Sequence, residues 1–144
     1  MSVTVNIKGL TVPSELALKS QRIVRKSIEE YTYDLHRVAT LRTPYDEGNL
    51  ETSGTKSIKN TNSGAVGKVS FKAMNKGFNY AVIMHDGRYK LGKKSLTKSS
   101  RGVRSKYANR TFKVGSKYLE GTALSCEKGY KADMLEKLTN SLNR

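Results

Sequence analysis

The sequence predicts a single α+β domain: an antiparallel sheet of about four to five strands flanked by a long N-terminal helix and a C-terminal helix. Three observations lead to this fold class. Residues 14–42 contain no Gly or Pro and carry apolar residues at three- and four-residue steps, as in an amphipathic helix. Residues 55–85 hold short apolar runs between turn formers, as strands do. A second segment with the apolar periodicity of a helix lies at the end of the sequence. The length of 144 residues favours one domain, 1–144, with one core.

The N-terminus predicts a short strand and then a helix start. Val3, Val5 and Ile7 alternate with polar residues, which is the period of a half-buried strand, and Gly9 ends it. Pro13 suits the first turn of a helix, and Ser14 is an alternative cap.

The first helix should be longer than a small core needs. Its apolar residues form one stripe, made of Val24, Ile28, Tyr31, Leu35 and Val38. A helix of about 28 residues would be about 42 Å long at about 1.5 Å per residue. We therefore expect part of it to pack on something other than the sheet.

A corner of four residues, Pro44, Asp46, Gly48 and Leu50, should end this helix and open the sheet. Pro44 lacks a backbone N–H and disfavours helical geometry at the residue before it. Asp46 can accept bonds from nearby backbone N–H groups, and Gly48 can take a positive φ. Leu50 would then be the first apolar residue of the incoming sheet. Local chemistry alone also fits an ordinary helix-to-strand corner.

A hairpin and a central strand should follow the corner. The hairpin pairs 55–59 with 65–73 through a turn at 60–64 that is rich in Asn, Ser and Gly. The run 78–85 is apolar on both faces apart from Asn79, which predicts a covered central strand. This strand contains Tyr80, Ala81 and His85, and Gly87 lies just past its end.

The end of the chain predicts one more strand, 111–114, and then a helix that begins at Gly115 and Ser116, with Ser116 as its cap. The apolar stripe of this helix runs from Leu119 to Leu142. Gly121 and Gly129 lie inside it, and each costs about 1 kcal/mol relative to Ala. The helix should therefore depend on tertiary or subunit contacts.

The positive charge is concentrated in one segment. The formal net charge is +15, and residues 87–117 hold eleven Lys and Arg without an Asp or Glu. We interpret the loop at about 87–110 as long and partly disordered, suited to salt-sensitive contact with phosphates or with an acidic protein surface. An ordinary solvated loop is the alternative. The candidate contacts with a DNA channel or a partner are Arg88, Lys90, Lys93, Lys94, Lys98, Arg101, Arg104, Lys106 and Arg110.

The composition offers little catalytic or metal chemistry. Cys126 is the single cysteine, so the chain has no internal disulfide and no Cys/His cluster with zinc spacing. No P-loop, serine elbow or carboxylate pair is present, and we expect no enzyme activity and no cofactor. No apolar run approaches the roughly 20 residues of a membrane span, and the polar N-terminus is unlike a signal peptide. We therefore expect an intracellular protein that does not contact a membrane. His85 beside Asp86 could in principle form an acid–base pair.

The order and spacing of these pieces resemble the small neck or tail-completion proteins of long-tailed bacteriophages, which join the DNA-filled head to the tail. The resemblance spans nearly the whole chain. The matching pieces are Lys8-Gly9-Leu10, Thr43-Pro44-x-Asp46-x-Gly48-x-Leu50-x-x-Ser53, Tyr80-Ala81, His85-x-Gly87 and Lys117-Tyr118-Leu119. This chain departs from the family where His85 replaces a frequent acidic residue, and where 111–115 lacks a frequent proline.

The resemblance implies a structural virion protein that is not an enzyme. Such proteins assemble as rings, and we expect a sixfold ring, with a twelvefold ring as the alternative. The ring would lie between the portal, adaptor or head-completion protein and the tail terminator or tail tube protein, with non-specific contact to packaged DNA. The protein would reside in the virion neck, and in the host cytoplasm during assembly.

Two other functions stay open at this stage. The charge alone fits a stand-alone basic module that binds nucleic acid. A small basic ribonuclease of the toxin type would need His85, Asp86 or Arg88 to act on RNA.

Overall fold

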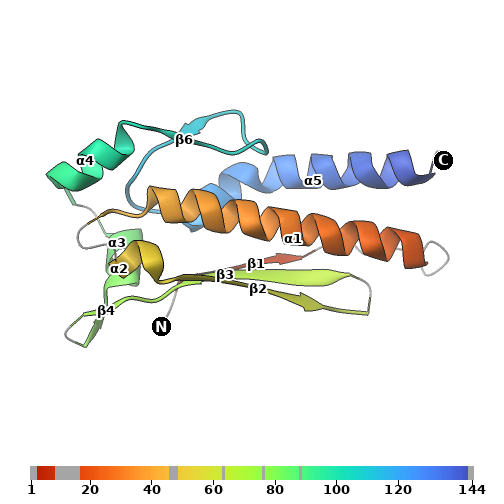
Figure 1. The fold of residues 1–144 in the computed structure, drawn as a ribbon, viewed down its shortest axis with the longest axis horizontal. Coiled ribbons are helices and arrows are strands. Elements are labelled where there is room, and N and C mark those ends of the chain that lie inside the picture. The colour runs from red at the N-terminus through yellow and green to blue at the C-terminus, as the bar shows by residue number, and fades with distance from the viewer. Residues whose placement is uncertain are drawn as a thin grey trace.

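The computed structural model describes residues 3–8, 17–45, 49–62, 64–75, 77–87 and 89–142. It confirms the α+β class: an antiparallel sheet is covered on one face by a long N-terminal helix, and a C-terminal helix packs along that helix (Figure 1). The described residues form seven strands, more than the expected four to five, because two short ladders of two strands each accompany the three-stranded sheet.

The main sheet has the strand order β1-β3-β2, and all its pairs are antiparallel. Its strands are β1 (Val3–Lys8), β2 (Gly54–Asn60) and β3 (Ala65–Phe71). The first strand and the hairpin are therefore confirmed. Val5 and Lys56 both pair with Val69, so these three residues lie on one face of the sheet. Alternate residues of β3 are buried on that face, toward the helices.

The first helix, α1 (Ala17–Arg42), lies across this face of the sheet. The predicted stripe is correct, since Val24, Ile28, Tyr31, Leu35 and Val38 are all buried. The part of α1 that the sheet does not use is covered by α5 (Glu120–Leu142), which runs beside it (Figure 1). The extra length of α1 is thus used within the chain itself.

Three tyrosines join α1, α5 and the segment between them. The rings of Tyr31 and Tyr130 are stacked with centroids 4.8 Å apart, and Tyr107 meets Tyr31 edge-on at 5.1 Å. The Tyr31 hydroxyl donates to Asp133 at 2.6 Å. Each such aromatic pair contributes about 0.5–1.5 kcal/mol of stability beyond the contribution of the apolar area that it buries. Much of the dependence of α5 on tertiary contacts is met here.

Two glycines allow close approach between elements. A Cβ on Gly67 of β3 would lie 1.8 Å from the Thr32 hydroxyl oxygen of α1, and a Cβ on Gly129 of α5 would lie 1.8 Å from the backbone oxygen of Tyr107. Real Cβ contacts are never this short. Gly129 therefore lowers the helix propensity of α5 but lets the chain around Tyr107 pack directly on the helix backbone.

The predicted central strand 78–85 is wrong. Only Phe78–Asn79 is extended, as β5, and it pairs with β4 (Met74–Asn75). Tyr80–Asp86 forms a helix, α3, that contains Ala81 and His85, and Gly87 caps its C-terminal end. The Asn79 side chain accepts a hydrogen bond from the Ala81 N–H at 3.1 Å, which is an N-cap. A short apolar run has no period that separates a strand from a buried helix, so the sequence pattern does not show that Asn79 is a helix cap.

The basic segment is not a loop throughout. It forms a helix, α4 (Lys93–Ser99), and a strand, β6 (Val103–Arg104), which pairs with β7 (Thr111–Phe112). The expected last strand is thus two residues long and has its partner inside the basic segment. The two-residue ladder is too short for its sequence to show an alternating pattern.

The corner is built differently from the prediction. α1 ends at Arg42, and Thr43 and Pro44 are buried, as expected for a helix end at a proline. Leu50 is buried but belongs to a single helical turn, α2 (Asn49–Thr52), and not to the sheet. Asp46 and Gly48 lie outside the described residues. The final helix begins at Glu120 and not at Ser116.

Candidate functional site

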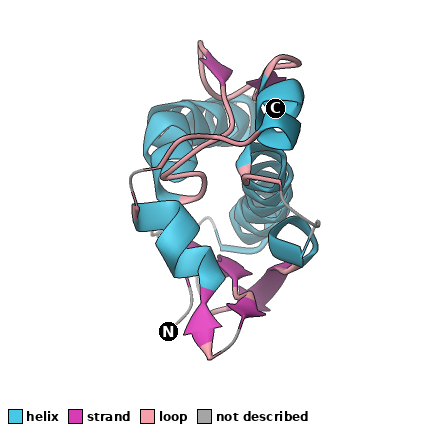
Figure 2. Ribbon diagram, turned by 90° about the vertical axis from the view of Figure 1, so that its left-hand side faces the viewer, coloured by secondary structure: helices cyan, strands magenta, loops and turns pink. Residues whose placement is uncertain are grey.

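A hollow lined by both charged and apolar side chains lies at the end of the molecule where α4 meets the C-terminal end of α1. Figure 2 views the ribbon from this end of the molecule. We call the hollow the α4 groove. Its volume is about 630 Å³. Apolar side chains from three separate segments line it: Leu41 of α1, Tyr45 of the corner and Val103 of β6. Lys93, Lys94 and Arg101 also line it.

Two polar contacts hold α4 in this place. The Ser95 hydroxyl accepts a hydrogen bond from the Tyr45 N–H at 2.8 Å and donates one to the Tyr45 carbonyl at 3.1 Å. The Lys98 ammonium donates to the carbonyls of Thr40 and Thr43 at 3.1 and 2.7 Å. These carbonyls belong to the end of α1, where cations are favourable.

Lys98 is therefore a structural residue, although the sequence made it a contact candidate. Its ammonium also lies 3.4 Å from a Glu51 carboxylate oxygen, and its side chain is only 14 % exposed. Burial lowers the pKa of Lys98, and Glu51 offsets part of that effect. The amine is used to fix α4 on α1 and is not free for a partner.

The other cations of the groove form no ion pair with a described residue. Lys93, Lys94 and Arg101 are exposed, and none of them has a carboxylate within 4.0 Å in the part of the chain that the structure describes. The Lys94 ammonium lies 5.8 Å from the centroid of the Tyr45 ring. A helix face and the turn after it thus bring three positive charges to the rim of an apolar floor.

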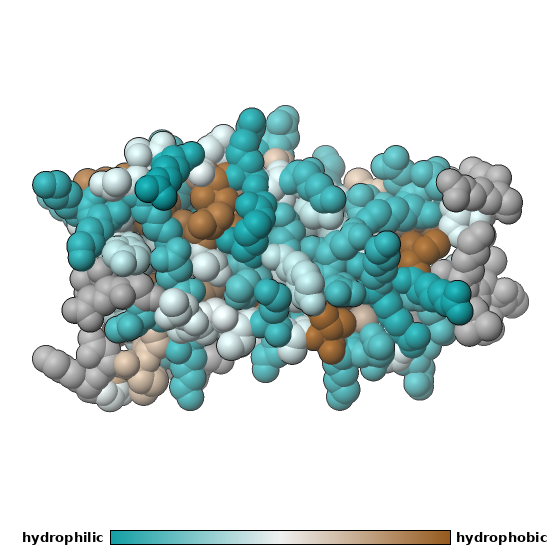
Figure 3. All heavy atoms as spheres, in the orientation of Figure 1, coloured by the Kyte–Doolittle hydropathy of each residue, from teal (hydrophilic) through white to brown (hydrophobic). Residues whose placement is uncertain are grey.

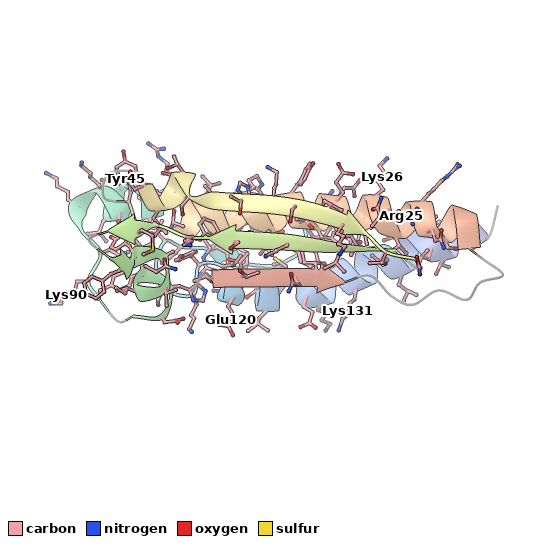
Figure 4. The ribbon with its side chains drawn as sticks, turned by 90° about the horizontal axis from the view of Figure 1, so that it is seen from below. Arg25, Lys26, Tyr45, Lys90, Glu120 and Lys131 are labelled. Carbon is pink, nitrogen blue, oxygen red and sulfur yellow. The ribbon has the colours of Figure 1, made fainter. Side chains whose placement is uncertain are left out.

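None of the other predicted cations that the structure describes lines the α4 groove, apart from Lys98. Lys90 lies at the same end as Tyr45 (Figure 4). Arg104, Lys106 and Arg110 belong to the segment around the β6–β7 ladder. Lys106 packs over the Tyr107 ring and Arg110 over the Phe112 ring, at 5.1 and 4.9 Å. Arg88 lies outside the described residues.

His85 has a structural role in the fold. Its Nε2 accepts a hydrogen bond from the Glu120 N–H at 3.1 Å, so the ring proton must be on Nδ1, which donates to Asp86 at 2.8 Å. The ring is 2 % exposed and meets Tyr118 edge-on. His85 and Asp86 do form the expected pair, but the imidazole has no free nitrogen for acid–base work. The hydrogen bond from His85, and then the one from Lys117, lowers the pKa of Asp86.

Tyr80 and Ala81 of the family-like motif serve the core. Ala81 is fully buried, and its carbonyl accepts a hydrogen bond from the Tyr118 hydroxyl at 2.7 Å. Burial raises the pKa of Tyr118. Tyr118 therefore lies beside Ala81 and His85 of α3, although it is distant from them in the sequence.

A second cationic surface was missed in the sequence. No described element of the chain covers the other face of the main sheet (Figures 1 and 4). By the register of the strands, Lys59 and Lys68 lie on that face, and both are exposed. No Asp or Glu occurs in β1, β2 or β3. The alternation of polar residues along these strands was the available signal. The floor of the α4 groove had no comparable signal in the sequence, because Leu41 and Val103 are more than 50 positions apart.

No protein-family model, curated protein or solved structure matches this chain. Within the described residues, no group of His, Cys, Asp and Glu side chains could hold a metal ion. No helix in that part of the chain is both long and apolar enough to cross a bilayer.

Proposed function

We propose that this chain is a structural virion protein of the neck of a long-tailed bacteriophage, where a ring of copies joins the DNA-filled head to the tail. The proposal starts from the sequence resemblance. Several of the motif residues that carry it are buried. These are Pro44, Leu50, Ala81 and His85, and Tyr118 bonds to the Ala81 carbonyl and packs on the His85 ring. A motif that maintains a fold fits a family defined by assembly better than one defined by a reaction.

The observation that carries the ring is the pair of open edges of the main sheet. β1 and β2 are both antiparallel to β3, so they run in the same direction on opposite sides of it. Neither has a second partner strand among the described residues. Edge strands present unpaired N–H and C=O groups. Two different edges favour a head-to-tail contact, and such a contact closes into a ring when its rotation closes.

The placement of His85 supports a role without catalysis. The ribonuclease alternative needs an imidazole nitrogen that reaches a substrate, and both nitrogens of His85 bond within the fold. Expression without loss of viability, unchanged by His85→Ala, agrees with the neck protein. Toxicity that His85→Ala removes would favour the ribonuclease.

The test of the ring is the mass of the purified protein, measured by light scattering over a range of concentrations, together with negative-stain images. We expect closed rings, and we favour a sixfold ring over a twelvefold one. The rings should form with the protein alone or with the adjoining portal-side and tail-side ring proteins. Strictly monomeric behaviour, even with those ring proteins present, would refute the proposal.

The second candidate is a stand-alone module that binds nucleic acid, and the net charge of +15 favours it. It predicts tight binding of duplex DNA or RNA by the monomer and a steep loss of affinity as salt rises. A neck protein should show only weak, non-specific binding before assembly.

A further inference from the structure

The α4 groove differs from a surface built for phosphates. Its floor contains Leu41 and Tyr45, which are 38 % and 37 % exposed, and Val103. The cations stand at its rim and not on a flat strip. Non-specific contact with a nucleic acid backbone needs cations and polar donors and gains little from an apolar hollow. In the space-filling view, hydrophobic surface lies near the C-terminal end of α1 and is surrounded by hydrophilic side chains (Figure 3).

The charge at the rim selects the sign of the partner. Lys93, Lys94 and Arg101 have no carboxylate partner among the described residues, and the positive charge of Lys98 behind them is largely taken up by Glu51 and the end of α1. An acidic segment would therefore meet three positive charges that form no ion pair within the described residues. The floor selects a second feature, because an apolar side chain seated on Leu41 and Val103 would be withdrawn from water.

We propose that the α4 groove binds an acidic segment of another protein that inserts one aliphatic or aromatic side chain between flanking carboxylates. The carboxylates pair with Lys93, Lys94 and Arg101, and the anchor rests on Leu41, Tyr45 and Val103. Few residues carry most of the energy in such a contact, and a buried anchor surrounded by a polar rim is the usual arrangement.

The inference rests on the proposed function only for the identity of the partner, which would be a ring protein next to this one in the neck. All the described residues that line the groove belong to one chain. Binding by the groove and closure of the ring can therefore succeed or fail separately.

The test is selection from a displayed library of random peptides on the immobilised protein, with removal of peptides that also bind a Lys93→Glu/Arg101→Glu variant. We expect the surviving peptides to share one apolar residue flanked by Asp or Glu. Fluorescence anisotropy of one labelled survivor then gives affinities. The charge-reversal variant Lys93→Glu/Arg101→Glu should bind this peptide about tenfold or more weakly than the wild type. A peptide with Ser in place of its apolar anchor should lose affinity for the wild-type protein by a similar factor.

The matched control is Lys59→Glu/Lys68→Glu, which changes the net charge equally but on the open face of the sheet. It should leave peptide affinity within about twofold, because exposed charges beyond a Debye length of about 8–10 Å are largely screened. The variant Leu41→Ser should lower the affinity for the peptide without changing how that affinity depends on salt concentration. Thermal melts of all variants show whether each remains folded.

Several results would overturn the inference. These are survivors without an acidic pattern, equal losses from both double reversals, or competition by duplex DNA that depends on Lys93 and Arg101 while an anchor-free acidic peptide binds equally well. A protein that binds the acidic peptide but stays monomeric even with the adjoining ring proteins present would support the groove and refute the ring. A ring that fails to select such peptides would do the reverse.

Discussion

The imidazole of His85, at the end of α3, accepts a hydrogen bond from the backbone N–H of Glu120, the first residue of α5. The first N–H groups of a helix have no partner inside it, so His85 takes the place of an N-cap from a distant part of the chain. The Asp86 carboxylate accepts from Nδ1 and so fixes the tautomer that this bond requires. The Lys117 ammonium donates a hydrogen bond to the same carboxylate at 3.0 Å. The contact ties α3 to α5.

The replacement His85→Ala should lower the free energy of unfolding by about 2 kcal/mol, because the cap is lost and a buried ring is removed. Ser116→Ala is the matched control, since Ser116 is the cap that the sequence predicts and is exposed in the structure. Its effect should stay within about 0.5 kcal/mol. Urea unfolding measures both, and a larger loss for Ser116→Ala would reverse the assignment.

The stability gap between the wild type and Asp86→Asn should depend on pH. The pKa of the Asp86 carboxylate is lowered in the folded protein, from an ordinary value of 3.8, chiefly by the His85 hydrogen bond and also by Lys117. Its contribution is therefore present above pH 3.8 and is lost as the pH falls through the folded value. Melting curves from neutral pH downward should show the gap closing, more so at low salt because the carboxylate is exposed. A gap that widens in acid would contradict this.

Glycine-to-alanine changes at two positions of α5 should have different effects. Gly129→Ala places a Cβ against the backbone oxygen of Tyr107, which cannot move without displacing the β6–β7 region, so we expect a loss of about 2–3 kcal/mol. At Gly121 the nearest atom is the Lys117 Cβ at 3.2 Å, and Gly121→Ala should be near neutral or gain up to about 1 kcal/mol in propensity. Equal effects in calorimetry would show that close approach at Tyr107 is unimportant.

The contact between Gly67 and Thr32 allows a test by a compensating change. Gly67→Ala alone should cost about 1–3 kcal/mol, because its Cβ would overlap the Thr32 hydroxyl. Thr32→Ala in the same chain removes that hydroxyl and should recover part of the loss. The coupling free energy from the double-mutant cycle should be about 1 kcal/mol, and additive effects would show that the two residues do not interact.

Lys98 and Lys93 lie on the same short helix but should behave differently. Lys98→Ala removes the donor to the end of α1 and should speed hydrogen exchange of the α4 amides, with a loss of about 1–2 kcal/mol in their protection. Lys93→Ala, at an exposed site, should leave protection unchanged. If both variants behave like the wild type, α4 is held by other contacts.

How far the sequence could predict the structure depended on the length of each pattern. The stripe of α1 and the alternation in β1 and β3 repeat over several turns or residues, and both were predicted correctly. The α3 run is short and continuously apolar, so nothing local separated helix from strand except Asn79. The basic segment has no apolar period, and α4 forms where Ser95 and Lys98 bond to Tyr45, Thr40 and Thr43.

The sequence by itself determined the α+β class, the two long helices, the three strands of the main sheet and the concentration of charge, because each follows from local periodicity or composition. The role of each cation depends on tertiary contacts, which bury Lys98 and bring Lys93, Lys94 and Arg101 beside apolar side chains in the groove. Arg104, Lys106 and Arg110 lie around the β6–β7 ladder and do not line the groove. The tertiary structure also gave His85 to the start of α5. These outcomes depend on contacts between residues far apart in the chain, which burial and hydrogen bonding select and no local pattern records.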